Sequence, residues 1–229
     1  MAQYESFRRA RRPEQKEHRR AVILEAAAQL AASKGVRSVN LGDISLAVGL
    51  SRSNVLRYFG TREEIYLQLA AERYQDWASR VIARLSRSAV VAPAEAAAVL
   101  ADCLAQDTLF CDLIAEGASA LEHNVSEDAV RAYKQTVFGV MDDVADVLAE
   151  RCEQLGKEQA DTVLSAAIVL TAGMWPWSNP SPVVAELYRT EPDMARHRFQ
   201  FVPALSRLLE AVVHGLAGQA GSAQAPSDE

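Results

Sequence analysis

Four polar side chains in the segment 52–57 have the types and the spacing that could read the edges of DNA bases. They are Arg52, Ser53, Asn54 and Arg57. An arginine can donate two hydrogen bonds to guanine, an asparagine can pair with adenine through two bonds, and a serine can bond either bases or phosphates. Val55 lies within this segment and Phe59 lies four residues later, so these two apolar residues share one face of a helix. The pattern therefore predicts a short helix that buries these two residues and presents the polar set outward.

The preceding residues could hold such a helix in place. Asn40 can cap a first short helix at about 41–48, whose buried face carries Leu41, Ile44 and Val48. Gly49 supplies a tight turn, and Ser51 can cap the second helix at about 52–58. Two helices joined in this way can place the second one in the major groove of DNA. A helical hairpin with a glycine turn also occurs in plain bundles, and the motif alone leaves that alternative open.

Charge is distributed unevenly along the 229 residues. The net charge is −6, yet the first 62 residues carry 12 Lys and Arg against 5 Asp and Glu. Because phosphate attraction is screened beyond about 8–10 Å at physiological salt, local charge decides DNA binding. A basic arm leads into the first helix and consists of Arg8, Arg9, Arg11, Arg12, Lys16, Arg19 and Arg20. Arg19 and Arg20 are predicted to contact DNA because they lie on an ordered helix, whereas the first dozen residues could equally be a solvated tail.

Helical periodicity predicts an all-α fold of about nine or ten helices. The first helix ends at Gly35, and Thr61 to Glu64 has the form of a capping box that starts a longer helix. Further helices are predicted at about 93–106, 107–121, 126–154, 158–175, 183–189 and 199–216. Three prolines between Trp175 and Pro182 are expected to prevent a continuous helix there. The tail from Gly218 is expected to be disordered.

The run from about His18 to Tyr66 resembles the DNA-binding domain of the TetR (tetracycline-repressor-like) family of regulators. The resemblance rests on the first helix ending at Gly35, Asp43-Ile44 with Gly49, the Ser51 start, Tyr58-Phe59, and Arg62-Glu63-Glu64. It implies a homodimer with a four-helix interface, an inducer pocket, base reading by the 52–57 set, and phosphate contacts by Asn40, Tyr58 and Arg62. Leu56 departs from the family, in which many members carry a tyrosine that reaches the DNA backbone.

The resemblance and the periodicity together predict three regions: a DNA-binding domain at 1–62, an effector-binding and dimerisation domain at 63–217, and a tail at 218–229. Residues placed in the bundle interior as effector contacts are Phe110, Leu113, Ile114, Glu116, Phe138, Met141, Trp175 and Trp177. Asp112, His123 and Asn124 are further polar candidates, although an ordinary core or solvated face explains all of these residues as well. The predicted dimer contacts are Ala160, Leu164, Ala167, Ile168, Leu205, Leu208, Leu209 and Val212. The helix at 158–175 is apolar on two sides and therefore needs burial on both.

Catalytic chemistry is not indicated. The sequence has no Gly-rich phosphate loop, no HExxH or ExxH metal pair and no GxSxG elbow, so we expect no enzyme, no metal and no cofactor. Its three cysteines lack CxxC spacing, which favours reduced thiols and a cytoplasmic protein, and no apolar run suggests a membrane span. The favoured function is a repressor that binds double-stranded DNA and responds to a small, mainly apolar effector. A helical-bundle enzyme and an architectural DNA-binding protein without an effector are the alternatives.

Overall fold

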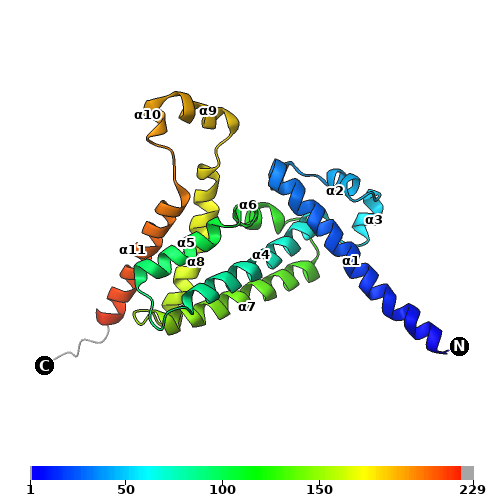
Figure 1. The fold of residues 1–229 in the computed structure, drawn as a ribbon, viewed down its shortest axis with the longest axis horizontal. Helices are drawn as coiled ribbons and strands as arrows, with labels where there is room; N and C mark the ends of the chain where they lie inside the picture. The colour runs from blue at the N-terminus through cyan, green and yellow to red at the C-terminus, as the bar shows by residue number, and fades with distance from the viewer. Residues whose placement is uncertain (1, 223–229) are drawn as a thin grey trace. The chain divides into compact units, whose positions relative to one another are not determined.

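The protein is helical throughout the part that the computed structural model describes, which is the backbone of residues 2–222 and the side chains of 14–117 and 120–217. No strand occurs among these residues, and the all-α prediction is confirmed (Figure 1). The N-terminal helices are α1 (Ala2–Lys34), α2 (Leu41–Ala47) and α3 (Arg52–Leu56), with a 3-10 turn at Val36–Ser38. The others are α4 (Arg62–Leu85), α5 (Pro93–Ala105), α6 (Thr108–Glu116), α7 (Glu127–Arg151), α8 (Lys157–Ser178), α9 (Pro182–Thr190), α10 (Pro192–Ala195) and α11 (Phe201–Ser222). A π-helical turn, Gly117–Leu121, follows α6.

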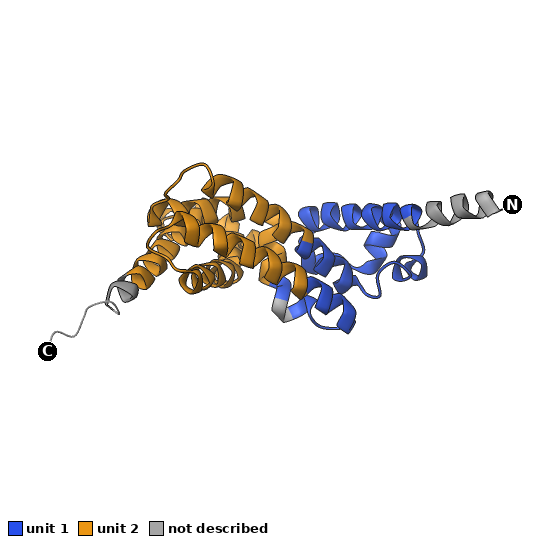
Figure 2. Cartoon of the chain, turned by 90° about the horizontal axis from the view of Figure 1, so that it is seen from below, with its two compact units in different colours: residues 1–71, 116–133 blue, residues 72–115, 134–229 orange. Residues whose placement is uncertain are grey.

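The described chain divides into two compact units (Figure 2). Unit 1 comprises the residues up to 71 together with 116–133, and unit 2 comprises 72–115 and the residues from 134 onward. The division differs from the boundary predicted at residue 63. Unit 1 takes the first turns of α4, and it also takes a segment that lies far along the chain. That segment is tied locally, because Ser126 donates from its N–H and its hydroxyl to Glu64 near the start of α4.

The core of unit 1 is built from one apolar face of each helix. Ile23 of α1, Ile44 of α2, Val55 of α3 and Ile65 of α4 are all fully buried, as their spacing predicts. Two glycines allow the turns between these helices. Gly35 ends α1 at φ 78° and Gly49 ends α2 at φ 64°, in the left-handed region that favours glycine. The helix-turn-helix expected from the sequence is therefore present.

In unit 2, α11 packs against α5 and α8. Leu205 and Leu209 of α11 are completely buried, as are Val163 and Leu164 of α8 and Leu100 of α5. Burial of these apolar faces removes hydrophobic surface from water, so the packing of the three helices forms one part of the core of unit 2. Trp77 of α4, Phe110 of α6 and Val144 of α7 are also completely buried there.

The expected break in the helix between Trp175 and Pro182 is present, because α8 ends at Ser178 and α9 begins at Pro182. It comes three residues after the predicted helix end at 175, since Pro176 lies in the final turn of α8, where little helix remains to be disrupted. Asn179 closes that end by donating from its main chain and its side chain to the Trp175 carbonyl. Helix α11 extends to Ser222, beyond the predicted start of the tail at Gly218, and 223–229 lie outside the described residues. The short α10 was not predicted.

None of the helices in the described residues is both long and apolar enough to cross a membrane.

Candidate nucleic-acid interface

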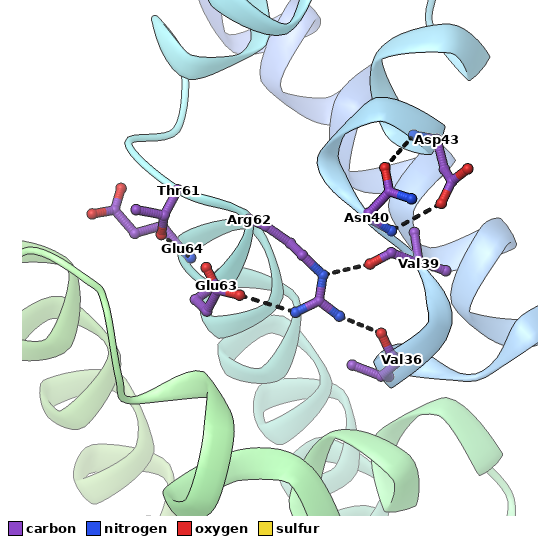
Figure 3. Close-up of polar contacts among 8 residues, drawn as sticks. All are labelled: Val36, Val39, Asn40, Asp43, Thr61, Arg62, Glu63 and Glu64. Carbon is purple, nitrogen blue, oxygen red and sulfur yellow. Dashed lines mark hydrogen bonds and ion pairs between the residues drawn. The ribbon is translucent and has the colours of Figure 1, made fainter.

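Side-chain caps fix the starts of the two short helices. The Asn40 side-chain oxygen accepts from the Gly42 N–H at 2.8 Å. It also accepts from the Asp43 N–H at 3.2 Å, and the Asp43 carboxylate accepts from the Asn40 N–H at 2.9 Å (Figure 3). The Ser51 hydroxyl accepts from the Asn54 N–H at 3.3 Å. Each cap satisfies N–H groups that have no partner within the helix. The phosphate contact expected of Asn40 stays a prediction.

Helix α3 presents the predicted polar set to solvent. Arg52, Ser53, Asn54 and Arg57 are all exposed, while Val55 on the opposite side is fully buried. The guanidinium of Arg52 lies over Gly42, where an added Cβ would collide with its Nη2 atom. The outward orientation inferred from spacing is therefore confirmed, and base contact stays a prediction. Leu56 is exposed on the same short helix, and no tyrosine takes its place.

A groove of about 1050 Å³ runs between α3 and the middle of α1. Its lining residues are Glu14, Gln15, Lys16, His18, Arg19, Leu50, Asn54, Arg57 and Tyr58. Three of these residues carry a positive charge and one carries a carboxylate, so the lining favours binding of the phosphate backbone of a nucleic acid. The structure thus brings Arg19 and Tyr58 together with two of the predicted base readers. The side chains of Arg8, Arg9, Arg11 and Arg12 lie outside the described residues.

Replacing Arg19 with alanine should weaken binding to every DNA sequence, because an exposed arginine in this groove is placed to neutralise a phosphate. We expect the slope of log K against log salt concentration to become shallower by about 0.9 for each phosphate that is no longer neutralised. Filter binding or fluorescence anisotropy over a salt series measures it. Arg87→Ala, an exposed arginine of unit 2, is the matched control. A slope identical to the wild-type slope would remove Arg19 from the interface.

Arg62 is directed into unit 1 (Figure 3). Its guanidinium donates to the carbonyls of Val36 and Val39, pairs with Glu63 at 3.1 Å, and lies 4.7 Å from the ring centroid of Tyr66. These contacts join the start of α4 to the residues just before α2. The phosphate contact that the resemblance implies for Arg62 stays a prediction, and its role inside the fold was not foreseen. Arg20 is also directed into unit 1.

Glu64 joins the start of α4 to the segment before α7. The predicted capping box forms in part: the Thr61 hydroxyl accepts from the Glu64 N–H at 3.1 Å, but the Glu64 carboxylate accepts from Gly60 at 2.8 Å instead of from Thr61. Its other oxygen accepts from the Ser126 N–H at 3.0 Å and hydroxyl at 2.7 Å. Partial burial raises the pKa of Glu64, but the bonds from Ser126 and Gly60 and the charge of Arg20 outweigh it and lower the pKa below its usual value.

Glu64→Gln should destabilise unit 1 at neutral pH by about 1–2 kcal/mol, because the bonds to a charged acceptor are weakened. A carboxyl whose pKa is lowered by folding stabilises the fold above its unfolded pKa of about 4.3, and this contribution is lost as the pH falls through the lower, folded pKa. Wild type and variant should therefore converge in acid. Urea unfolding at pH 7 and in acid measures this, with exposed Glu25→Gln as control. Equal stability at pH 7 would contradict the assigned contacts.

Six of the eight predicted effector residues are found in three environments. Phe110, Leu113, Ile114 and Trp175 are buried in unit 2, where the Trp175 indole N–H donates to Asp112 at 2.6 Å. Met141 is half-buried. Glu116 folds with unit 1 and pairs with Arg37 at 2.5 Å.

Two of the effector assignments are corrected by the structure. Phe138 is 62% exposed and Trp177 is 72% exposed, so neither faces the interior of its own chain. Phe138 follows Val137 on α7 and is rotated by about 100° from the buried stripe. Trp177 lies two positions after the buried Trp175 and so points to the opposite side of α8.

Sequence reasoning missed part of the interior of unit 2. Tyr74 and Trp77 of α4 surround Phe110, with ring centroids 4.8 Å and 6.2 Å from it. The Trp77 indole N–H and the Thr171 hydroxyl are buried and have no hydrogen-bond partner among the described residues. Buried polar groups without partners are rare in native proteins. Helical spacing gives no indication that a buried polar atom lacks a partner, so the sequence did not reveal this feature.

The predicted dimer contacts also need correction. Ala160, Leu164, Ala167, Leu205 and Leu209 are completely covered within one chain, because the inner faces of α8 and α11 pack against each other. Ile168 and Val212 are half-buried. The apolar side chains left uncovered include Val169, 70% exposed on the second apolar side of α8, and Leu208, 44% exposed on α11.

Among the described residues, no group of three or more His, Cys, Asp or Glu side chains could hold a metal ion. All three cysteines are free and buried, and burial raises the pKa of Cys111 to about 12. At neutral pH this thiol is protonated and is a weak nucleophile.

Sequence comparison matches two segments of the chain to family descriptions. Residues 23–69 match "Bacterial regulatory proteins, tetR family", and residues 71–220 match "Tetracyclin repressor-like, C-terminal domain". A comparison with curated proteins gives no significant match.

Two solved structures share the fold. The fatty acid degradation regulator FadR from Bacillus halodurans is 14% identical with a TM-score of 0.52, over 86% of this chain and 97% of that one. The transcriptional regulator FadR from Bacillus subtilis, in complex with stearoyl-CoA, is 16% identical with a TM-score of 0.51, over 84% of this chain and 96% of that one. At this identity the likeness concerns the fold alone.

Proposed function

The chain belongs to the TetR family of bacterial regulatory proteins, and from this premise we propose that it is a homodimeric repressor, released from a palindromic operator by a small, mainly apolar effector. A DNA-binding domain and a ligand-binding C-terminal domain make it a transcription regulator. The observation that carries the proposal is the surface of α3, where Arg52, Ser53, Asn54 and Arg57 are all exposed next to a groove lined by cations.

In the proposed complex α3 enters the major groove. Arg57 and Asn54 are the candidates for bidentate base contacts. Arg19 and Lys16 lie on α1, on the other side of the protein's own groove, and attract the phosphate backbone of the DNA. This division of work assigns sequence selectivity to α3 and general affinity to α1. A local basic surface of this kind explains how a protein with a negative net charge would bind DNA.

A dimer is proposed because unpaired apolar side chains remain on α8 and α11. Val169 and Leu208 are exposed, and Ala166, Leu170 and Val212 beside them are half-buried. Contact between these outer faces and a second copy would bury them in a four-helix arrangement. A two-fold dimer presents two copies of α3, which explains why a palindromic operator is proposed.

The effector site is proposed within unit 2. Its interior is mainly apolar and aromatic, as in most ligand pockets, and the Trp77 N–H and Thr171 hydroxyl are polar groups that a ligand could satisfy. The Bacillus subtilis relative of the same fold is solved with stearoyl-CoA, a ligand with a long apolar chain. An effector that binds the conformer of low DNA affinity more tightly shifts the population toward it, and DNA is released.

A titration of the purified protein tests the proposal. Stearoyl-CoA, stearate and a cationic amphiphile of equal chain length are added separately while tryptophan fluorescence and binding to the operator are followed. We expect one of them to change the emission of the buried Trp77 and Trp175 and to release DNA over the same concentration range. The contrary outcome is that a protein purified without bound ligand binds DNA and that no compound in a wide panel of apolar molecules alters this binding. That result would favour an architectural DNA-binding protein instead.

The enzyme alternative is the weaker one. Regulators of this family are generally DNA-binding proteins without enzymatic activity, and sequence-selective DNA binding by the purified chain would separate the two classes.

A further inference from the structure

Arg20 is turned into unit 1, although its neighbour Arg19 lines the groove. Its guanidinium donates one N–H to the main-chain carbonyl of Tyr58 and another to the side-chain oxygen of Gln68 on α4. The same group lies over the ring of Phe59, with 4.2 Å between the guanidinium carbon and the ring centroid. The side chain is 24% exposed. One arginine of α1 thus contacts both α4 and the residues that follow α3.

The C-terminal end of α3 needs such a contact. The helix has only five residues, Arg52–Leu56, which is too short to be stable by itself. Ser51 caps its start and the buried Val55 fixes its inner face. At the other end, the N–H groups of Arg57 and Phe59 bond the carbonyls of Asn54 and Val55. The Tyr58 carbonyl, two residues past that end and directly after Arg57, accepts from Arg20. This bond restrains the main chain from which the Arg57 side chain starts.

We propose that Arg20 is a positioning residue for base reading and does not itself bind phosphate. The inference rests on the proposed DNA-binding function and adds to it. A guanidinium is a planar fork, and two of its N–H groups are already directed at Tyr58 and Gln68. Rotation toward a phosphate would take both bonds away and would also lift the group from the ring of Phe59. Arg20 and Arg19 are adjacent in sequence, yet they have different roles.

The two arginines form a matched pair for the test. Affinity is measured for the operator and for unrelated DNA over a salt series, at a temperature where circular dichroism shows each variant to be folded. Arg20→Ala should lower operator affinity by about tenfold or more, with reduced selectivity at the base pair that Arg57 reads. Its salt slope and its binding to unrelated DNA should equal those of wild type, whereas Arg19→Ala should weaken both kinds of binding. A shallower salt slope for Arg20→Ala would overturn the proposal.

Two further variants separate positioning from charge. Arg20→Lys keeps the charge, and lysine binds phosphate well, so restored operator affinity would contradict the proposal. We expect no restored selectivity, because an ammonium group lacks the fork. Gln68→Leu removes the acceptor on α4 without changing charge and should lower operator affinity in the same direction as Arg20→Ala.

Amide exchange in the absence of DNA keeps the inference testable if the proposed function fails. Faster exchange at Tyr58 and Phe59 in Gln68→Leu, relative to wild type, is the expected result. Unchanged exchange there would refute the positioning role. Wild-type protein that binds no DNA selectively would refute the proposed function and leave this measurement to decide the role of Arg20.

Discussion

Replacing Arg57 or Asn54 with alanine should lower the affinity of the dimer for its operator by about 2–6 kcal/mol, roughly 30-fold to 20,000-fold. Each side chain is exposed on α3 and can make a two-bond contact worth about 1–3 kcal/mol of base discrimination, and the dimer contains it twice. Binding to unrelated DNA should change much less. Anisotropy titrations with the operator and with a scrambled sequence measure both affinities.

Arg87→Ala provides the control for the removal of one exposed arginine outside unit 1. The variants should also be compared on operators altered one base pair at a time. Altering the base pair that the replaced side chain reads should weaken binding less for the variant than for wild type, because the variant no longer distinguishes bases there. If both α3 variants bound the operator as tightly as wild type, α3 would not be the reading helix.

The second large effect is expected for Arg62→Ala, which should cost unit 1 about 3–5 kcal/mol of stability. The guanidinium bonds the carbonyls of Val36 and Val39 and covers the ring of Tyr66 (Figure 3). Its removal leaves these partly buried carbonyls without a charged donor. Hydrogen exchange across Leu41–Ala47 measures the destabilisation locally, which matters because two units need not unfold together.

Arg62→Lys should recover only part of this stability, because one ammonium cannot bond both carbonyls in the geometry of the guanidinium fork. The same variants decide whether Arg62 also contacts DNA. If Arg62→Ala left exchange unchanged and only flattened the salt dependence of DNA binding, the residue would be a phosphate contact and its role in the fold would be minor.

The features that could be predicted from the sequence are local ones. Helical spacing identified the buried Ile44 and Val55, and the positive φ angles of Gly35 and Gly49 agree with the predicted turns. Such features depend on residues within one or two turns of each other, so periodicity and capping chemistry are sufficient.

Features that depend on distant residues could not be predicted. Arg19, Arg20 and Arg62 look alike in a basic segment, and only the position of Gln68 or of the Val36 carbonyl distinguishes an inward arginine from an outward one. The packing of 116–133 with unit 1 depends on the pair Glu64 and Ser126, which are 62 residues apart. The apolar pattern of α8 predicted that two faces of this helix need burial, but it did not indicate which face is buried within its own chain.

The central claim is that this chain, as a dimer, reads a specific DNA sequence through α3. Selection of bound sites from a pool of random duplexes tests it most directly, with the Arg57→Ala protein selected in parallel. The wild type should enrich a palindrome whose half-site centres lie about one helical turn, or a multiple of it, apart. The variant should lose the preference at the same base pair in both halves. Enrichment of no sequence, or of a site that Arg57→Ala selects equally well, would contradict the account.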